Sequence, residues 1–87
     1  MMDFKKSTRK DKKYMVMYNE KWIHFGDARY EHFFDSTPLK LYSNLNHNDP
    51  QRRTSYLARA KGIKDKQGNL TYLDKNSPNH YSVKYLW

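Results

Sequence analysis

Cysteine is absent from this 87-residue chain, and glycine and proline are scarce, with three of each. The lack of cysteine excludes disulfides and thiolate metal sites, and it is typical of proteins that mature in a reducing compartment. The three isolated glycines exclude a glycine-rich phosphate loop. No window approaches the roughly 20 apolar residues of a membrane-spanning helix, and the first residues lack the apolar run of a signal peptide. We therefore expect an intracellular protein without a membrane span.

Hydrophobic residues make up only 37% of the chain, whereas aromatic residues make up 16% and include eight tyrosines. A chain of this length forms one domain and buries little more than about 60% of its unfolded surface, so its stability is marginal. Tyrosine rings can pack in a core while the hydroxyl stays in water. We expect a small α+β domain over residues 14–87 with a thin aromatic core that a partner helps to stabilise.

Positive charge is the strongest compositional feature, with a formal net charge of +8. Half of this excess lies in residues 1–13, which contain six Lys or Arg against Asp3 and Asp11. The segment is poor in large apolar residues, so its composition predicts a disordered basic arm that can lie along a phosphate backbone or an acidic protein surface. The alternative is a solvated tail that only aids solubility. The cations of the arm are Lys5, Lys6, Arg9, Lys10, Lys12 and Lys13.

The segment YMVMYNEKWIHF predicts a β-hairpin. Strands over 14–18 and 21–25 are rich in β-branched and aromatic residues, and Asn19 and Glu20 join them. The two-residue period places Tyr14, Val16 and Tyr18 on one face and Met15 and Met17 on the other. It also places Trp22 and His24 opposite Ile23 and Phe25.

The stretch KWIHFGDARY, at 21–30, is either an active site or the centre of a small core. We interpret it as core, with Ile23, Phe25 and Tyr30 packed inside. Gly26 permits the turn, Asp27 with Arg29 fixes the local backbone, and His24 is partly buried and hydrogen-bonded. Tyr30, Phe33 and Phe34 are spaced to share the face of a short helical segment.

Proline marks three predicted helix starts. Pro38, Pro50 and Pro78 follow Thr37, Asp49 and Ser77, which can each cap a helix. The helix from Pro50 is expected to end at Gly62 and to bury Tyr56, Ala60 and Ile63. A turn at 67–69 then precedes a strand-like segment over 70–73. The last helix is expected to stack Tyr81 on Tyr85 and to dock its end, either in the core or on a neighbour.

Catalytic patterns are missing. The histidines are His24, His32, His47 and His80, and the spacing between the first two matches no metal-ligand pattern. The string NHND at 46–49 resembles part of the one-metal site of small nucleases, but the second histidine and the ββα context are missing. Ser77 lacks the Gly-x-Ser-x-Gly turn of a hydrolase nucleophile. We expect no catalytic residue, metal, cofactor or small-molecule substrate.

Several stretches of the chain carry a family resemblance, namely KKYMVM, KWIHFGDARYEHF, HNDPQRRTSYLARAKGI, GNLTYLDKNSPN and SVKYLW. Together they resemble a family of small basic proteins of unknown function encoded by large DNA viruses of protists and algae, with IHFG and SPN…S…YLW as the most specific motifs. The similarity runs from about Lys13 to Trp87. It implies a viral origin and a virion component that assembles inside the host cell. It implies no catalytic residues.

Two functional classes follow from the charge and from the resemblance. The first is a minor capsid (cement) protein that bridges larger capsid subunits, and the second is a nucleic-acid-binding protein associated with the viral genome. In either class we expect the cations of the arm and Arg52, Arg53 and Arg59 to contact the acidic partner or the phosphates. Trp22, Tyr85, Leu86 and Trp87 are the predicted apolar docking residues.

Overall fold

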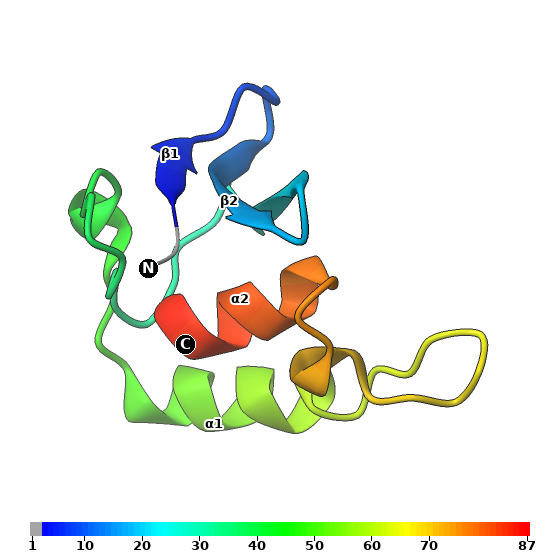
Figure 1. Cartoon of the computed structure of the whole chain (residues 1–87). Coiled ribbons are helices and arrows are strands. Elements are labelled where there is room, and N and C mark those ends of the chain that lie inside the picture. Colours follow the sequence, from blue (N-terminus) through cyan, green and yellow to red (C-terminus); the bar gives the residue numbers. More distant parts are fainter. Residues whose placement is uncertain (1–2) are drawn as a thin grey trace.

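The computed structural model describes residues 3–87 and contains a three-stranded antiparallel sheet and two α-helices (Figure 1). The strands, in their order across the sheet, are β1 (Phe4–Lys6), β2 (Lys12–Tyr18) and β3 (Lys21–Asp27). The short 3-10 helix η1 (Ser43–Leu45) precedes helix α1 (Pro50–Ala60), and η2 (Thr71–Leu73) precedes helix α2 (Pro78–Tyr85). The chain is a small single α+β domain, as the sequence predicts.

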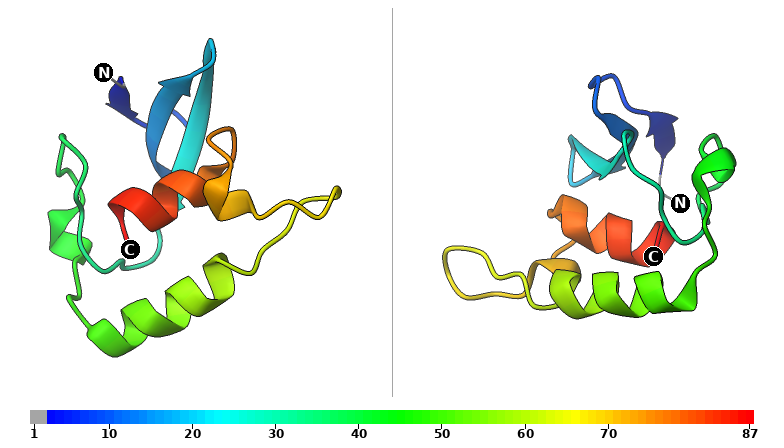
Figure 2. Two further views of the ribbon diagram at one scale, coloured as in Figure 1. Left: turned by 60° about the horizontal axis from the view of Figure 1, so that its bottom comes forward. Right: turned by 180° about the vertical axis from the view of Figure 1, so that it is seen from behind.

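Helix α2 lies between the sheet and α1, so the domain has three layers (Figures 1 and 2). The apolar core lies between the sheet and α2, and we call it the aromatic core. Its buried members are Tyr14, Val16, Ile23, Phe25, Tyr81 and Leu86. Phe25 is central, because its ring lies 5.9 Å from that of Tyr14 and 5.7 Å from that of Tyr81.

The predicted hairpin is confirmed. Asn19 and Glu20 both have positive φ angles, of 55° and 65°, which is the backbone of a type I′ turn and matches the twist of the two strands. Val16 pairs with Ile23 and Tyr14 pairs with Phe25, so the predicted inward face is the one that packs on α2. Gly26, with φ 77°, lies in β3 beside Leu86, where an added Cβ would be 2.8 Å from the Leu86 Cδ1 atom.

The prediction of a disordered arm over residues 1–13 is wrong for the part that the structure describes. Phe4–Lys6 form β1, which pairs with β2 so that Phe4 faces Val16. The Phe4 ring packs edge-on against Tyr85, with 4.9 Å between the ring centroids. One aromatic side chain and a strand edge therefore order a segment that its charge alone would leave in solvent. Met1 and Met2 lie outside the described residues.

The predicted helices around Pro38 and over Tyr30–Phe34 are also wrong. Thr37 does accept a hydrogen bond from the Lys40 backbone N–H, at 3.2 Å, as a helix cap would. Lys40 then adopts a left-handed φ of 51°, which ends the turn. The N–H groups of Phe33, Phe34 and Ser36 bind the last carbonyl oxygens of α2 instead, and this caps that helix. Tyr30 is 65% exposed and is not a core residue.

The two later helix starts are confirmed. The Asp49 side chain accepts hydrogen bonds from the backbone of Gln51 and Arg52, and Ser77 accepts one from Asn79. Tyr81 and Tyr85 stack with their rings 6° from parallel. Ile63, however, is half exposed beyond the end of α1, and Leu70 makes only an isolated bridge before the 3-10 turn η2, so the predicted strand is wrong.

Candidate functional site

Five of the predicted cationic contacts lie in one ordered segment, the N-terminal ribbon, which we define as residues 4–12. Ser7 fixes its tip to the sheet, because the Ser7 hydroxyl is hydrogen-bonded to His24 Nδ1 at 2.7 Å and accepts the Arg9 N–H at 3.0 Å. Within residues 3–87, no ion pair involves a cation of this ribbon. The ribbon lies on the side of the molecule opposite α1 (Figure 1). Its cations are Lys5, Lys6, Arg9, Lys10 and Lys12.

Lys13, the sixth predicted contact, is buried and cannot reach a partner on the surface. Only 2% of the residue is exposed, and its Nζ donates at 2.8 Å to the Tyr30 carbonyl oxygen and to His32 Nδ1. The prediction for Lys13 is therefore wrong, because Tyr30 and His32 of the segment after β3 cover its side chain, which shares with Met15 the face of β2 opposite Tyr14. Burial lowers the pKa of Lys13 to about 8, although Asp27 and Asp35 oppose this.

Lys13 begins a chain of buried polar contacts that we call the polar network. His32 Nδ1 accepts from Lys13, so the neutral ring carries its proton on Nε2 and donates to Asn46 Oδ1 at 2.6 Å. Asn46 Oδ1 also accepts the Asp35 backbone N–H at 2.8 Å. Burial and the nearby Lys13 charge lower the pKa of His32, which keeps the imidazole neutral.

Asp35 is the acceptor at the other end of the polar network. Its carboxylate binds the Tyr14 hydroxyl, the backbone and hydroxyl of Thr37, and the Tyr42 N–H. The Tyr14 hydroxyl in turn accepts the Leu41 N–H at 2.8 Å. Although burial acts in the opposite direction, the bonds from Thr37 and Tyr14 lower the pKa of Asp35. The network thus attaches the long segment 28–48 to the sheet.

The three arginines of α1 do not form one contact strip. Arg52 forms an ion pair with Glu31 at 2.9 Å. Arg53 lies on another side of the helix, donates to the Trp87 carbonyl oxygen at 2.7 Å and covers the Phe33 ring. Arg59 has no ion pair within the described residues. The structure thus leaves Arg53 and Arg59 without an ion pair in the described chain, and of these two only Arg59 also lacks a side-chain hydrogen bond.

The predicted apolar docking end is mostly internal. Leu86 is 1% exposed in the aromatic core, and Tyr85 packs against Phe4 and Tyr81. Trp87 stacks on Tyr56 at 4.0 Å between ring centroids. All three residues pack within their own domain, and the prediction of Leu86 as a surface contact is wrong, whereas Tyr85 and Trp87 stay partly exposed. Trp22, half-buried on the outer face of the sheet, lies beneath the Lys5 ammonium at 5.2 Å.

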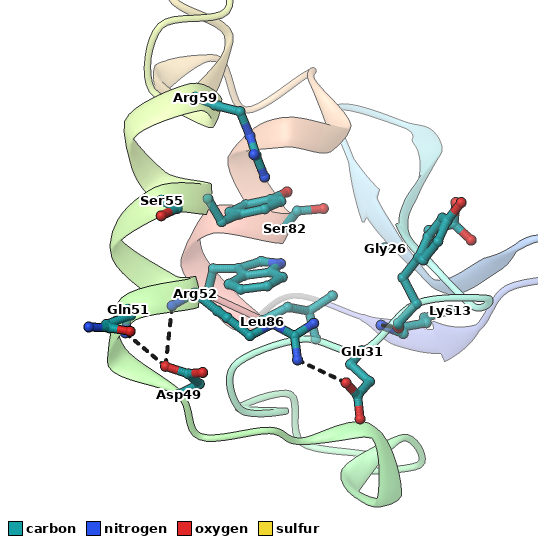
Figure 3. A pocket seen from close by; sticks show the side chains of 14 residues that line it. Lys13, Gly26, Glu31, Asp49, Gln51, Arg52, Ser55, Arg59, Ser82 and Leu86 are labelled. Atoms are coloured by element: carbon teal, nitrogen blue, oxygen red, sulfur yellow. Dashed lines mark hydrogen bonds and ion pairs between the residues drawn. The ribbon is translucent and has the colours of Figure 1, made fainter.

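A pocket of about 550 Å³ lies between α1, the end of α2 and the segment that follows β3 (Figure 3). Arg59 reaches over it from α1, and the ion pair between Arg52 and Glu31 crosses it at the other end (Figure 3). Lys13 lies on the opposite wall. Tyr30, Tyr56, Leu86 and Trp87 supply apolar lining, and Asp27, Asp49, Ser55 and Ser82 supply polar lining. Sequence reasoning missed this pocket, because its walls lie far apart along the chain.

Each of the four histidines is hydrogen-bonded through at least one ring nitrogen. His80 Nδ1 is 2.7 Å from the Tyr72 carbonyl oxygen, and His47 Nδ1 accepts the Asp49 N–H. Among residues 3–87, no three His, Cys, Asp or Glu side chains are grouped closely enough to hold a metal ion. None of the helices described has the length and hydropathy needed to cross a membrane.

Comparison with known proteins places most of the described fold in one family. No curated protein and no solved structure matches the chain. Residues 2–60, which include all three strands, the polar network and α1, match a family of unknown function, DUF5754. Because the match covers more than half of the chain, the protein belongs to the family of unknown function DUF5754.

Proposed function

We propose that the protein is a non-catalytic nucleic-acid-binding protein that contacts the phosphate backbone through its N-terminal ribbon. The observation that carries this proposal is the set of five cations on an ordered ribbon, none of which forms an ion pair within the described chain. Ordering matters, since a fixed tip loses less conformational entropy on binding than a disordered arm. Phosphate contacts of this kind give affinity without sequence specificity.

Trp22 favours nucleic acid over an acidic protein surface. Its ring lies on the outer face of the sheet, pairs across the strands with Met17 and contacts Lys5. An aromatic ring beside a row of cations is the combination that single-strand-binding surfaces use, because every base can stack on it. The C-terminal aromatic residues that suited a protein partner are engaged in the core and in the stack on Tyr56.

A salt series with duplex and single-stranded DNA of random sequence tests the proposal. If all five cations contact phosphates, the logarithm of the affinity should fall with the logarithm of salt at a slope of about −4 to −5. Between 50 and 200 mM salt, the affinity should then drop roughly 10²- to 10³-fold. Failure to bind at low salt would overturn the proposal.

A pair of charge-matched variants separates the ribbon from net charge. R9E/K10E and K64E/K66E each replace two exposed cations with carboxylates, the first on the ribbon tip and the second in the loop after α1. We expect R9E/K10E to weaken DNA binding by about tenfold or more and to reduce the slope of log affinity against log salt by about 2. K64E/K66E should change binding only a few-fold at physiological salt, where screening limits distant charges. Equal losses would show that net charge alone holds the complex.

A minor capsid protein that bridges larger capsid subunits is the second candidate. The observation in its favour is the exposure of three large apolar side chains in one short segment after Phe33, namely Phe34, Leu39 and Leu41. Such exposure is typical of protein–protein contacts. Purified capsid subunits would bind the protein in high salt, and F34S/L41S would abolish that binding while leaving DNA binding intact. The salt response thus distinguishes the two candidates.

A further inference from the structure

The pocket between α1 and α2 contains carboxylates that are already engaged. Glu31 binds Arg52 within the lining, and Asp27 binds the Arg29 guanidinium through both oxygens. Asp49 accepts the first backbone N–H groups of α1. These acids therefore have little capacity left for a cationic ligand.

The donors that line the pocket are less fully used. The Arg59 guanidinium has no hydrogen bond or ion pair within residues 3–87, and Figure 3 shows the side chain extended from α1 toward Ser82 of α2. Lys13, on the opposite wall, uses two of its three ammonium N–H groups, for Tyr30 and His32. Two cations that face one cavity with their acidic neighbours engaged favour an anionic, acceptor-rich ligand.

The rest of the lining is apolar and aromatic. Leu86 and Tyr30 form part of the wall, and so do the stacked rings of Tyr56 and Trp87, of which Tyr56 lies on the same helix as Arg59. A volume of about 550 Å³ lies within the range of sites for whole small molecules and far exceeds what a bare phosphate ion fills. The ligand therefore carries a ring system as well as its anionic group.

We infer that this pocket binds a nucleotide, with the phosphate held by Arg59 and the base packed against the aromatic wall formed by Tyr56 and Trp87. The nucleotide is either a free mononucleotide or the phosphorylated end of a strand, because both present the same chemistry. The inference does not depend on the proposed ribbon contact with DNA, since the pocket and the ribbon share no residue.

Fluorescence of Trp87 reports on the pocket directly. The chain has two tryptophans, so W22F leaves Trp87 as the single emitter. In this background we expect AMP to quench the emission saturably, and adenosine, which lacks the phosphate, to bind at least tenfold more weakly. A dinucleotide with a 5′-phosphate and its 5′-hydroxyl form distinguish the two sources: if only the phosphorylated dinucleotide binds, the ligand is a strand end, and if AMP suffices, it is a free nucleotide.

R59A is the variant that tests the assignment, and K64A is its charge-matched control outside the pocket. R59A should weaken AMP binding at least tenfold, K64A should leave it unchanged, and R9E/K10E should lose DNA binding without losing AMP. Arg59 is exposed on α1, so its truncation should not unfold the domain. Absence of saturable quenching by AMP and by both dinucleotides, or equal affinities of R59A and K64A, would overturn the inference.

Discussion

The aromatic core and the polar network are two buried clusters of opposite chemistry that share one side chain, Tyr14. Its ring packs against Phe25 and Tyr42 at 5.9 and 5.4 Å between centroids, while its hydroxyl binds Asp35 and the Leu41 N–H. The aromatic core joins the sheet to α2. The polar network joins the sheet to segment 28–48, which has little regular structure of its own.

The difference shows how a chain of low apolar content is held together. The aromatic core stabilises in proportion to the area it removes from water. The polar network contributes less per bond, but its groups are desolvated, so the loss of one partner leaves another buried and unpaired. We therefore expect the core to carry most of the stability and the network to determine where segment 28–48, including Tyr30 and Glu31 of the pocket wall, lies.

The largest expected effect comes from breaking the aromatic core. Phe25 is fully buried and touches rings from β1, β2 and α2, so F25A removes a side chain that its neighbours cannot replace. We expect a loss of about 3–5 kcal/mol in the free energy of unfolding, measured by urea denaturation. L73A removes an apolar side chain that is 63% exposed and should change stability by less than about 0.5 kcal/mol. Similar losses for both variants would contradict the assigned core.

The next effect comes from breaking the polar network. D35A leaves the Tyr14 hydroxyl, the Thr37 hydroxyl and the Tyr42 N–H without their acceptor. We expect a loss of about 2–4 kcal/mol and faster hydrogen exchange over residues 35–46. D65A is the matched control, because Asp65 also accepts backbone N–H groups, from Gln67 and Asn69, but in an exposed turn. If D35A costs no more than D65A, the network is not a determinant of the fold.

The sequence predicted the elements of the aromatic core because their signals are local. The alternation of residue types over 14–18 and 21–25 depends only on residues of one hairpin, and the pairing of the two strands confirms it. Each helix cap, at Asp49 and at Ser77, depends only on residues of one turn, and both caps are confirmed. Phe4 was missed because one aromatic residue among lysines gives no periodic signal. It becomes ordered through residues distant along the chain, by pairing with Val16 and by packing against Phe25 and Tyr85.

The polar network and the pocket could not be predicted in this way. The bond from Lys13 to His32 joins residues 19 positions apart, and the bond from Tyr14 to Asp35 joins residues 21 positions apart. Composition gives no information about such pairs. Only the Asx-type turn formed by Asp35 and Thr37 has a local signal, the string DSTP, and the same string is typical of a helix start. Charge counting likewise identifies Lys13 as a cation, but only its contacts with Tyr30 and His32, 17 and 19 positions away, show that it is buried.

The smallest expected effect sharpens the comparison, because it concerns the one cation inside the polar network. Burial lowers the pKa of Lys13 from 10.5 to about 8, so between these values the unfolded chain binds more protons than the folded one. The free energy of unfolding should therefore rise with pH through this window, by on the order of 2 kcal/mol between pH 8 and 10. Burial and the bond to Asp35 raise the pKa of Tyr14 to about 12, which acts in the opposite direction above pH 10 and sets the upper limit of the measurement.

K13M removes the titrating group while keeping the approximate length of the side chain. Urea denaturation at steps of half a pH unit should therefore show the rise in the native protein and not in the variant. Parallel curves for the two proteins would mean that Lys13 gains its proton equally in both states, and the polar network would then hold the ammonium without an electrostatic cost.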